Sequence, residues 1–416
     1  MAIFRKGDIF MKKFIMYGAG NIGRGFIGQT FSLAGYSVGF VDINEEVISR
    51  LNTDKCYPVN VVTTDNNQEI LVNNVYGIDG KNIDLVADEI ANCDLMATAI
   101  GVNVLKFIAK PISLGIKKRF EISKKPLNII ICENLIGADE YLKGLIKKEI
   151  PELEDYIESS VGFIEASIGR MVPVMTEEKR QGNPLRVYVE PYNILPVDKN
   201  AFKGEAVKGV ANLYPYAPFN LFIQRKLFMH NMSHALLSYL GYLRNYEFIY
   251  QAVNDYDLRY VALRALCQMA VAISKENNAD IQMLIDHAEN LLYRFTNTAL
   301  GDTIKRVGKD TQRKLGSNDR LIGALKLAEK HNVYAGYLCI GIAAGLFFNP
   351  DDDESSITLS AFAKENGVEK TLKEYSSYEG KYVGLIKEIY DLLIGGKSID
   401  YIINYIDSLN GKEIKV

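Results

Sequence analysis

The sequence predicts an α/β protein with a doubly wound parallel sheet in its N-terminal part and a mostly α-helical C-terminal part. Between residues 12 and 196, short apolar runs alternate with helical stretches, as crossover connections between parallel strands require. Beyond residue 202, apolar residues recur at helical spacing and strand signals become rare. We expect domains at residues 1–198 and 199–416, since a chain of 416 residues can form two cores.

Four apolar runs are the predicted strands of the parallel sheet, at residues 14–17, 38–41, 95–99 and 128–132. An inserted β-hairpin, formed by residues 57–64 and 68–72 around Asp65-Asn66-Asn67, is expected to cap this sheet. A further strand is expected at residues 186–190, before a proline-containing joint at residues 191–196. The clearest helical patterns follow at residues 256–273 and 281–293.

Three segments invite other interpretations. The longest uncharged run, residues 334–348, is shorter than the roughly 20 residues that span a bilayer, so it predicts a buried helix and no membrane contact. The acidic run at residues 351–354 predicts a solvated loop. Residues 1–13 lack a signal-peptide core and predict a ragged extension, with Met11 as an alternative start.

Composition restricts the class of binding partner and the cellular compartment. The formal net charge is −3, and no basic cluster is interleaved with aromatic residues, which argues against a nucleic-acid partner. The five cysteines are scattered without a CxxC pair, which predicts free thiols in a reducing compartment and therefore a cytoplasmic protein. Small anionic ligands remain compatible with this charge.

A glycine-rich turn follows the first predicted strand and opens a helix. Gly18, Gly20 and Gly23 form a GxGxxG pattern, with Asn21 and Ile22 before the third glycine. In a Rossmann-type dinucleotide-binding turn, these glycines allow the tight turn, the approach of a pyrophosphate and close helix–sheet packing. The helix N-terminus then faces the phosphates.

The second predicted strand ends at Asp42, about 20 residues after the glycine turn, where an acidic residue meets the adenosine ribose in this fold. A carboxylate there accepts hydrogen bonds from the ribose of NAD and repels the extra phosphate of NADP. No Arg or Lys follows in residues 43–46. The sequence therefore predicts NAD as the cofactor.

Lys226, Asn231 and His234 are candidate catalytic residues. On an α-helix, Asn231 and His234 lie about 140° and about 80° from Lys226, which places all three on one side. A lysine whose pKa is lowered by burial can move the proton of a substrate hydroxyl, and amide or imidazole donors can stabilise an alkoxide. A lysine at a helix edge with two satisfied polar neighbours is the structural alternative.

His230 and His234 also form an HxxxH pattern that could bind zinc. The chain has only two other histidines, His287 and His331, and no clustered cysteines, so a zinc site would need a distant carboxylate. Zinc is therefore the competing chemistry.

Several motifs in this order resemble the polyol-specific long-chain dehydrogenases of the mannitol dehydrogenase family, over nearly the whole chain. They are Gly18-Ala-Gly-Asn-Ile-Gly-Arg-Gly-Phe-Ile-Gly28, Thr98-Ala-Ile-Gly101, Cys132-Glu-Asn134, Val161-Gly-Phe163, Arg170-x2-Pro173, Lys226-x4-Asn231-x2-His234 and Asp319-Arg-Leu-Ile322.

The resemblance implies roles for the candidate residues. Lys226 would be the general acid/base, with Asn231 and His234 as partners of the substrate oxygen and no metal. Asn134 would lie near the reacting carbon, although a helix N-cap is its structural alternative. Thr98 and Gly101 would line the far side of the cofactor.

The densest basic stretch, residues 305–314, matches the segment with which family members contact polyol or phosphate oxygens. Arg306, Lys309 and Lys314 are the implied substrate-binding residues, although such a run is usually a solvated face. The chain departs from the family at residue 169, where Gly169 replaces the Asp of a Val-Asp-Arg signature, and Glu165 is the nearest acidic residue before it.

The implied activity is the NAD-dependent interconversion of D-mannitol 1-phosphate and D-fructose 6-phosphate by a monomer or small homo-oligomer. Two alternatives stay open. The same chemistry could act on a free polyol or a hexuronate, as in other branches of the family. The missing acidic residue at position 169 also permits a non-catalytic NAD-binding sensor.

Overall fold

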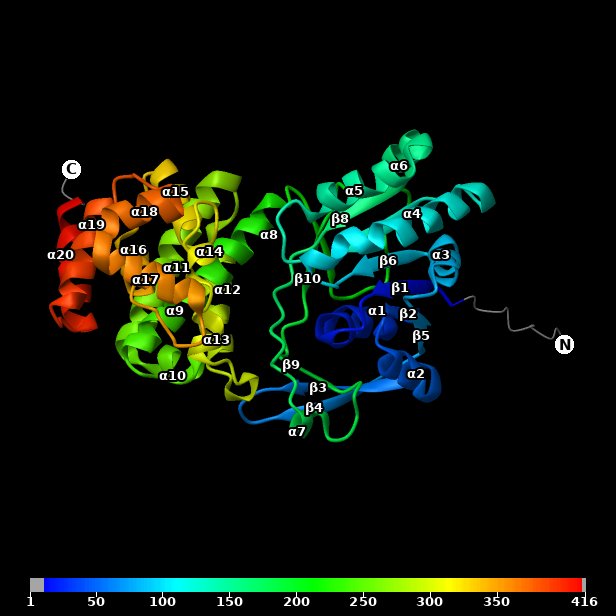
Figure 1. The fold of residues 1–416 in the computed structure, drawn as a ribbon, viewed down its shortest axis with the longest axis horizontal. Coiled ribbons are helices and arrows are strands. Elements are labelled where there is room, and N and C mark those ends of the chain that lie inside the picture. Colours follow the sequence, from blue (N-terminus) through cyan, green and yellow to red (C-terminus); the bar gives the residue numbers. More distant parts are fainter. Residues whose placement is uncertain (1–10, 414–416) are drawn as a thin grey trace. The chain divides into compact units, whose positions relative to one another are not determined.

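The computed structural model describes residues 11–413, which form two compact units divided between Phe219 and Asn220 (Figure 1). The sequence pattern suggested a boundary at 198/199. Residues 199–219 belong with the first unit because β11 (Leu213–Tyr216) pairs in parallel with β10 (Leu195–Asp198). Most of the predicted N-terminal extension, residues 1–10, lies outside the described residues.

The first unit is built on a six-stranded sheet with the order β5-β2-β1-β6-β7-β8, in which every neighbouring pair is parallel. This is the doubly wound Rossmann arrangement, and its strand order reverses between β1 and β6. The strands are β1 (Lys13–Tyr17), β2 (Ser37–Asp42), β5 (Val75–Asp79), β6 (Leu95–Thr98), β7 (Leu127–Ile131) and β8 (Val161–Glu165). The sequence predicted four of the six and missed β5 and β8.

Both faces of this sheet are buried, as a parallel sheet requires. In β1, Phe14 and Met16 join one apolar cluster, and Ile15 and Tyr17 join the cluster on the opposite face. Figure 1 shows α3, α4, α5 and α6 on one side of the sheet and α1 on the other. The helical segments of this unit are η1 (Gly23–Gly28), α1 (Gln29–Leu33), α2 (Glu45–Asp54), α3 (Ile83–Ala91), η2 (Val102–Val104), α4 (Leu105–Ile122), α5 (Ala138–Glu149), η3 (Pro151–Leu153), α6 (Glu154–Ser160) and α7 (Glu177–Arg180).

The predicted hairpin is confirmed as β3 (Cys56–Val62) and β4 (Asn67–Asn73), which pair antiparallel around a turn closed by a hydrogen bond from Thr63 N to Asn66 O. The strand expected at residues 186–190 is β9 (Val187–Val189), and it pairs in parallel with β3. The three strands pack into the apolar cluster that contains Phe14 and Phe26. This small sheet therefore covers the glycine-turn side of the main sheet.

In its described part, the second unit consists of helical segments joined by loops, with one isolated β-bridge between Phe248 and Thr303. The two helices expected at residues 256–273 and 281–293 are α11 and α12. Its helical segments are α8 (Asn220–Arg225), η4 (Lys226–Asn231), α9 (Met232–Leu243), α10 (Ile249–Asn254), α11 (Tyr256–Asn277), α12 (Ile281–Phe295), η5 (Thr298–Leu300), α13 (Ile304–Gly308), α14 (Thr311–Lys314), α15 (Ile322–Lys330), α16 (Gly336–Gly345), α17 (Glu354–Asn366), α18 (Val368–Ser376), α19 (Val383–Ile394) and α20 (Ile399–Glu413).

The uncharged run is the core helix α16, in which every residue is buried. Its glycines allow close packing on α9, since a Cβ at Gly341 would lie 2.9 Å from the Leu236 side chain. Among the described helices, none has both the length and the apolar character needed to cross a membrane. The five cysteines are free thiols, as predicted.

The prediction of a solvated acidic loop is wrong in part. Asp351 and Asp352 are exposed, but Asp353 is buried and accepts hydrogen bonds from Asp310 N at 2.7 Å and from Ser356 Oγ. Glu354 begins α17. The carboxylate of Asp353 is therefore hydrogen-bonded within the protein at the start of α17 and is not solvated.

Candidate active site

The glycine turn has the geometry that a dinucleotide requires. Gly18 has φ +105°, and a Cβ there would lie 2.5 Å from the carbonyl oxygen of Ala99, so only glycine fits. A Cβ at Gly23 would lie 2.0 Å from the carbonyl oxygen of Gly18. A Cβ at Gly20 would meet no protein atom within 4 Å, so this glycine borders open space. The first helical turn begins at Asn21, where backbone N–H groups have no helical acceptor.

A pocket of about 470 Å³ opens beside this turn and is lined by Gly20, Asn21, Asp42 and nine further residues of the first unit. The carboxylate of Asp42 accepts hydrogen bonds from Ala19 N at 2.8 Å and from Asn44 N at 3.0 Å. These bonds tie the end of β2 to the glycine turn. They leave further acceptor capacity on both carboxylate oxygens for the hydroxyls of a ribose.

Arg24 is a structural residue of the pocket that sequence reasoning missed. The residue is 3% exposed, and its guanidinium donates to the carbonyl oxygens of Ala19, Leu185 and Pro184, with a distance of 3.1 Å to Leu185 O. Burial lowers its pKa to about 10, which leaves it charged at neutral pH. Arg24 therefore fixes the glycine turn against the segment that follows α7. Its position in the sequence, directly after Gly23, was the signal that could have identified it.

The loop after β6 carries Thr98 and Gly101. Thr98 is fully buried at the end of the strand, whereas Gly101 is exposed, has φ +90° and borders open space. The buried carboxylate of Glu133 accepts Ile100 N at 3.0 Å and Gly101 N at 2.9 Å. Glu133 was also missed as a positioning residue, although it lies inside the Cys132-Glu-Asn134 motif.

Asn134 lies beyond the carboxyl end of β7 and is exposed. The N-cap of α5 is Gly137, so the helix-cap alternative for Asn134 is wrong. Glu165, at the end of β8, accepts Gly137 N at 3.2 Å and so holds the loop that follows Asn134. Parallel strands bring these loops to the same edge of the sheet as the glycine turn, where ligands of this fold bind.

Gly169, which replaces the acidic residue of the family signature, lies beside the ring of Tyr192. A Cβ there would lie 3.2 Å from a ring carbon of Tyr192, so a larger side chain would displace that ring. The next residue, Arg170, is buried and donates to Glu190 O at 2.9 Å, Gly25 O at 2.9 Å and Gln29 Oε1 at 2.7 Å. Arg170 therefore anchors this loop to η1.

In the second unit, the helix that carries Lys226 differs from the expectation. Residues Lys226–Asn231 form one turn of π-helix, η4, between α8 and α9. A π-helix bonds residues five apart, so Asn231 lies one turn below Lys226 instead of about 140° around the helix. The angles calculated for an α-helix are therefore wrong, while the two side chains still share one side. Both residues are half-buried.

His234 follows on α9 and stacks on Phe295, with ring centroids 4.8 Å apart and ring planes 12° apart. Its Nε2 lies 3.4 Å from Oδ2 of Asp302. Burial opposes ionisation of the Asp302 carboxyl, but His234 and Arg306 outweigh it and hold the pKa of this carboxyl below its usual range. Asp302 is the third functional candidate that the sequence did not reveal, because it lies 68 residues after His234.

The zinc hypothesis concerns His230 and His234, whose ring centroids are 6.1 Å apart. Burial, aided by the nearby charge of Arg294, lowers the pKa of His230 well below 6.5, so its ring is neutral. Within residues 11–413, no group of three or more His, Cys, Asp or Glu side chains has an arrangement that could hold a metal ion.

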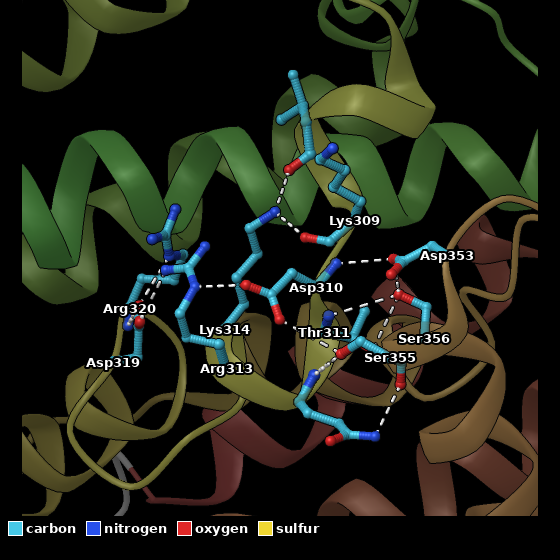
Figure 2. Close-up of polar contacts among 12 residues, drawn as sticks. Lys309, Asp310, Thr311, Arg313, Lys314, Asp319, Arg320, Asp353, Ser355 and Ser356 are labelled. Carbon is cyan, nitrogen blue, oxygen red and sulfur yellow. Dashed lines mark hydrogen bonds and ion pairs between the residues drawn. The ribbon is translucent and has the colours of Figure 1, made fainter. Parts of the chain in front are cut away.

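The basic stretch contains three differently placed cations. Arg306 forms an ion pair with Asp302, and the side chain of Lys309 is exposed. Lys314 is 5% exposed, and its Nζ donates to the carbonyl oxygens of Val307, at 2.6 Å, and of Lys309 (Figure 2). Burial, reinforced by Arg320 and Arg313, lowers the pKa of Lys314 to about 7. Two of its three donors thus serve the backbone that carries Arg306.

The loop between α13 and α14 is fastened to the start of α17 (Figure 2). Asp310 has φ +65° and donates its N–H to Asp353, while its side chain accepts from Arg313 at 2.5 Å and from Ser355 at 3.3 Å. Thr311 Oγ1 donates to Ser356 Oγ at 3.1 Å. Asp302 therefore contacts both Arg306 and His234. Lys309 and Lys314 lie on the segment whose loop is hydrogen-bonded to α17.

NAD fits the residues of the first unit. The open space at Gly20 and Gly101 allows the cofactor to approach the backbone closely. The N–H groups at the helix N-terminus suit a pyrophosphate, and the carboxylate of Asp42 suits the hydroxyls of a ribose. Asp42 and Glu46 line the same pocket with negative charge and disfavour a further phosphate at the ribose, although Arg24 and Arg180 line it as well.

Comparison with known proteins agrees with this architecture. Residues 12–209 match the mannitol dehydrogenase Rossmann domain, and residues 219–388 match the mannitol dehydrogenase C-terminal domain. The mannitol-1-phosphate 5-dehydrogenase of Clostridium acetobutylicum is 36% identical over 374 residues, which are 89% of this chain and 96% of that relative. The enzyme of the same name from Brevibacillus brevis is 38% identical over 362 residues, 86% of this chain and 92% of the relative.

Solved structures share the fold at low sequence identity. D-sorbitol dehydrogenase in substrate-free form has a TM-score of 0.79 at 16% identity and covers 92% of each chain. Mannitol 2-dehydrogenase of Pseudomonas fluorescens, solved with NAD and D-mannitol, has a TM-score of 0.73 at 15% identity, covering 97% of this chain and 95% of that one. Together with the two matched domains and the relatives above, these observations establish that the chain belongs to the mannitol dehydrogenase family.

Proposed function

We propose that this protein is an NAD-dependent dehydrogenase that interconverts D-mannitol 1-phosphate and D-fructose 6-phosphate. The observation that carries the proposal is its relationship, along nearly the whole of both chains, to relatives named mannitol-1-phosphate 5-dehydrogenase. Oxidation of mannitol 1-phosphate at carbon 5 leaves a ketone next to one terminal carbon. Numbered from that end, the product is a 2-ketohexose with its phosphate on carbon 6.

Lys226 moves the proton in this mechanism. In the direction of oxidation, the neutral amine accepts the proton of the substrate hydroxyl, and in the direction of reduction the ammonium returns it to the ketone oxygen. The π-turn sets Asn231 one turn from Lys226, so its amide can donate to the same oxygen while charge develops there. His234, and Asn134 of the first unit, are the further polar contacts that we propose for the substrate.

When bound, the nicotinamide ring of NAD supplies the acceptor or donor of the hydride. The glycine turn at Gly18–Gly23, with Asn21 and Ile22, would hold the pyrophosphate through backbone N–H groups. Asp42 would orient the adenosine ribose, and Thr98 and Gly101 lie on the loop proposed for the far side of the cofactor. The protein's contribution is therefore to orient the cofactor and to place a proton carrier at the reacting oxygen.

Arg306 and the loop that carries Lys309 and Lys314 are proposed to contact the substrate's phosphate or hydroxyl oxygens. Arg306 already shares the carboxylate of Asp302, so an incoming phosphate would compete with or extend that pair. Lys314 has one donor beyond its two backbone carbonyls. We also propose a cytoplasmic location, because the five thiols are free and the substrate is a phosphorylated metabolite.

The test is NADH oxidation with fructose 6-phosphate, compared with fructose and with a hexuronate, using NADPH and a metal chelator as controls. We expect turnover of fructose 6-phosphate with NADH to exceed that of the other pairs, with no effect of the chelator. Turnover of fructose or the hexuronate alone would move the protein to another branch of the family. NADH binding without any turnover would identify an NAD-binding sensor.

The glycine at position 169 is the reason for testing a free sugar beside the phosphorylated substrate. The residue stands where the family's signature has an acidic side chain, and Tyr192 lies against the position of its Cβ. Gly169→Asp should slow turnover if the Tyr192 ring is part of the working site, and should accelerate it if the missing carboxylate limits the reaction.

A further inference from the structure

The ring of His234 is restrained in its plane but not in its orientation within that plane. Phe295 stacks on it at 4.8 Å and 12°, and the ring of His230 lies tilted 6.1 Å away. A half-turn of the imidazole about its Cβ–Cγ bond would keep the same stacking and exchange the two edges. Aromatic contacts alone therefore do not select which nitrogen faces the substrate.

Asp302 makes that selection. Oδ2 of this carboxylate lies 3.4 Å from Nε2 of His234. Nε2 is buried and makes no hydrogen bond to any described group, so the carboxylate of Asp302 is the charged acceptor that faces it. The two atoms are close without forming a hydrogen bond, and hydrogen bonds of catalytic groups often tighten only when substrate binds. A buried N–H without an acceptor is unfavourable, so the ring orientation that turns Nε2 towards Asp302 is favoured.

The carboxylate is itself held in place. Asp302 is 9% exposed, its Oδ1 pairs with Arg306, and its carbonyl oxygen accepts Ile249 N at 2.9 Å. The neighbouring residue Thr303 forms a β-bridge with Phe248. The backbone contacts of Asp302 and Thr303 thus fix the position of the acceptor that faces the ring of His234.

The state of this carboxyl decides which nitrogen carries the hydrogen. The influence of His234 and Arg306 exceeds the effect of burial and holds the pKa of Asp302 below its usual range, so the group is ionised at neutral pH. An ionised carboxylate can only accept hydrogen bonds, so the nitrogen facing it carries the hydrogen. In a neutral imidazole, the other nitrogen is then an acceptor.

We propose that Asp302 is a positioning residue that holds His234 as the tautomer with hydrogen on Nε2, so the neutral ring presents an acceptor, Nδ1, to the substrate. The role in the reaction rests on the proposed function. On this assignment, neutral His234 orients a substrate hydroxyl by accepting its hydrogen, and Asn231 and Lys226 are left as the donors to the developing alkoxide. This differs from the sequence-based expectation that His234 donates to that oxygen.

The tautomer can be measured on the intact protein without substrate. Long-range ¹H–¹⁵N correlation spectra of ¹⁵N-histidine-labelled protein should contain four imidazoles, and His234→Gln assigns one of them. We expect His234 above pH 8 to be the Nε2–H tautomer alone, and Asp302→Ala to give a mixture of both tautomers. An Nδ1–H tautomer in the wild-type protein overturns the proposal, whatever the variant does.

A double-mutant cycle tests the catalytic consequence. Asp302→Asn should lower kcat at least about tenfold in the wild-type background, the scale of a misoriented active-site group, and should have little further effect in the His234→Gln background. Asp257→Asn, which breaks an aspartate–arginine pair with Arg244 at 2.7 Å, is the matched control and should change neither value.

Arg306→Gln separates the two partners of Asp302. If the effect of Asp302→Asn disappears in the Arg306→Gln background but persists in the His234→Gln background, Asp302 acts through the arginine and the proposal is overturned. Failure of the wild-type enzyme to turn over fructose 6-phosphate would refute the proposed function. The tautomer measurement would still stand in that case, so the two failures can be told apart.

Discussion

Glu133 holds Gly101 in place through a hydrogen bond of 2.9 Å from the glycine N–H to a buried carboxylate oxygen, and its second oxygen accepts Ile100 N at 3.0 Å. Two loops at the carboxyl edge of the sheet are thereby joined by one side chain. Glu133→Gln can satisfy only one of the two N–H groups. Since a hydrogen bond to a charged group contributes about 1.5–3 kcal/mol, we expect the Kd of NADH to rise about tenfold or more in fluorescence titration.

The control for this change is Glu152→Gln, an exposed glutamate that pairs with Lys117 at 3.0 Å. It should leave the Kd of NADH unchanged. An unaltered Kd in Glu133→Gln would mean that the loop at Gly101 does not contact the cofactor.

Asp42 should determine the choice of cofactor. Asp42→Asn keeps an acceptor for Ala19 N but removes the negative charge that opposes a 2′-phosphate. We expect the ratio of kcat/KM for NADPH to that for NADH to rise about tenfold, the effect of about 1.4 kcal/mol of relieved repulsion. Glu45→Gln, on the exposed first turn of α2, should leave the ratio as it is. An equal loss with both cofactors would limit Asp42 to a structural role.

Lys226 should be indispensable for turnover. Lys226→Ala removes the proposed proton carrier, and a loss in kcat of about 10²–10⁴-fold is typical for a general acid/base. The Kd of NADH should stay within about twofold, because the cofactor contacts that we propose lie in the first unit. Lys275→Ala, a lysine that contacts His331 O at 3.2 Å, is the control. Residual turnover near that of the wild type would assign the proton transfer to another residue.

Arg306 should distinguish phosphorylated from free substrates. If it binds phosphate, Arg306→Ala should raise KM for fructose 6-phosphate by about tenfold or more, the scale of a charge-assisted hydrogen bond, and leave KM for fructose nearly unchanged. Lys305→Ala, the exposed neighbour, should have a small effect. A fall in kcat for both substrates, without selectivity in KM, would instead show that Arg306 acts through Asp302.

Lys314 should make stability depend on pH. Its pKa is about 7 in the folded protein against an ordinary value of 10.5, so between these values the unfolded chain binds more protons and stability rises with pH. The slope from this group is at most about 1.4 kcal/mol per pH unit. Lys314→Met should abolish the contribution, so the wild-type protein should gain thermal midpoint relative to the variant as pH rises from 7 to 10. A constant difference between the two would contradict the lowered pKa.

Much of the first unit could be predicted because its signals are local. The apolar runs of β1, β2, β6 and β7 are short and continuous, and the glycine turn follows the first of them directly. β5 and β8 escaped prediction. Each contains a glycine, which weakens a strand signal, although β2 was predicted despite Gly39. The reason for a glycine at these two positions appears only in the fold. A Cβ at Gly77 would lie 2.7 Å from Ile48 O, and one at Gly162 would lie 2.3 Å from the Asn128 side chain.

The candidate site divides in the same way. The residue types at Lys226, Asn231 and His234 can be read along the chain, but their arrangement around the helix could not. A π-turn differs from an α-turn only in bonding residues five apart instead of four apart, and the sequence carries no clear signal of this change. Asp302 and Glu133 could not be found by spacing at all. Each acts on groups that are distant in sequence, such as His234 for Asp302, and folding alone brings them together.

The sequence by itself determined the fold class, the family and the glycine turn with Asp42, because these depend on periodicity and on short motifs whose geometry is set within a few residues. Only the tertiary structure decided that Lys314 is buried among backbone carbonyls, that Arg306 is paired, and that a carboxylate faces His234. The reason is that burial and pairing are properties of neighbours in space. A charge in a basic run has the same sequence signature whether it is solvated, structural or poised to meet a substrate.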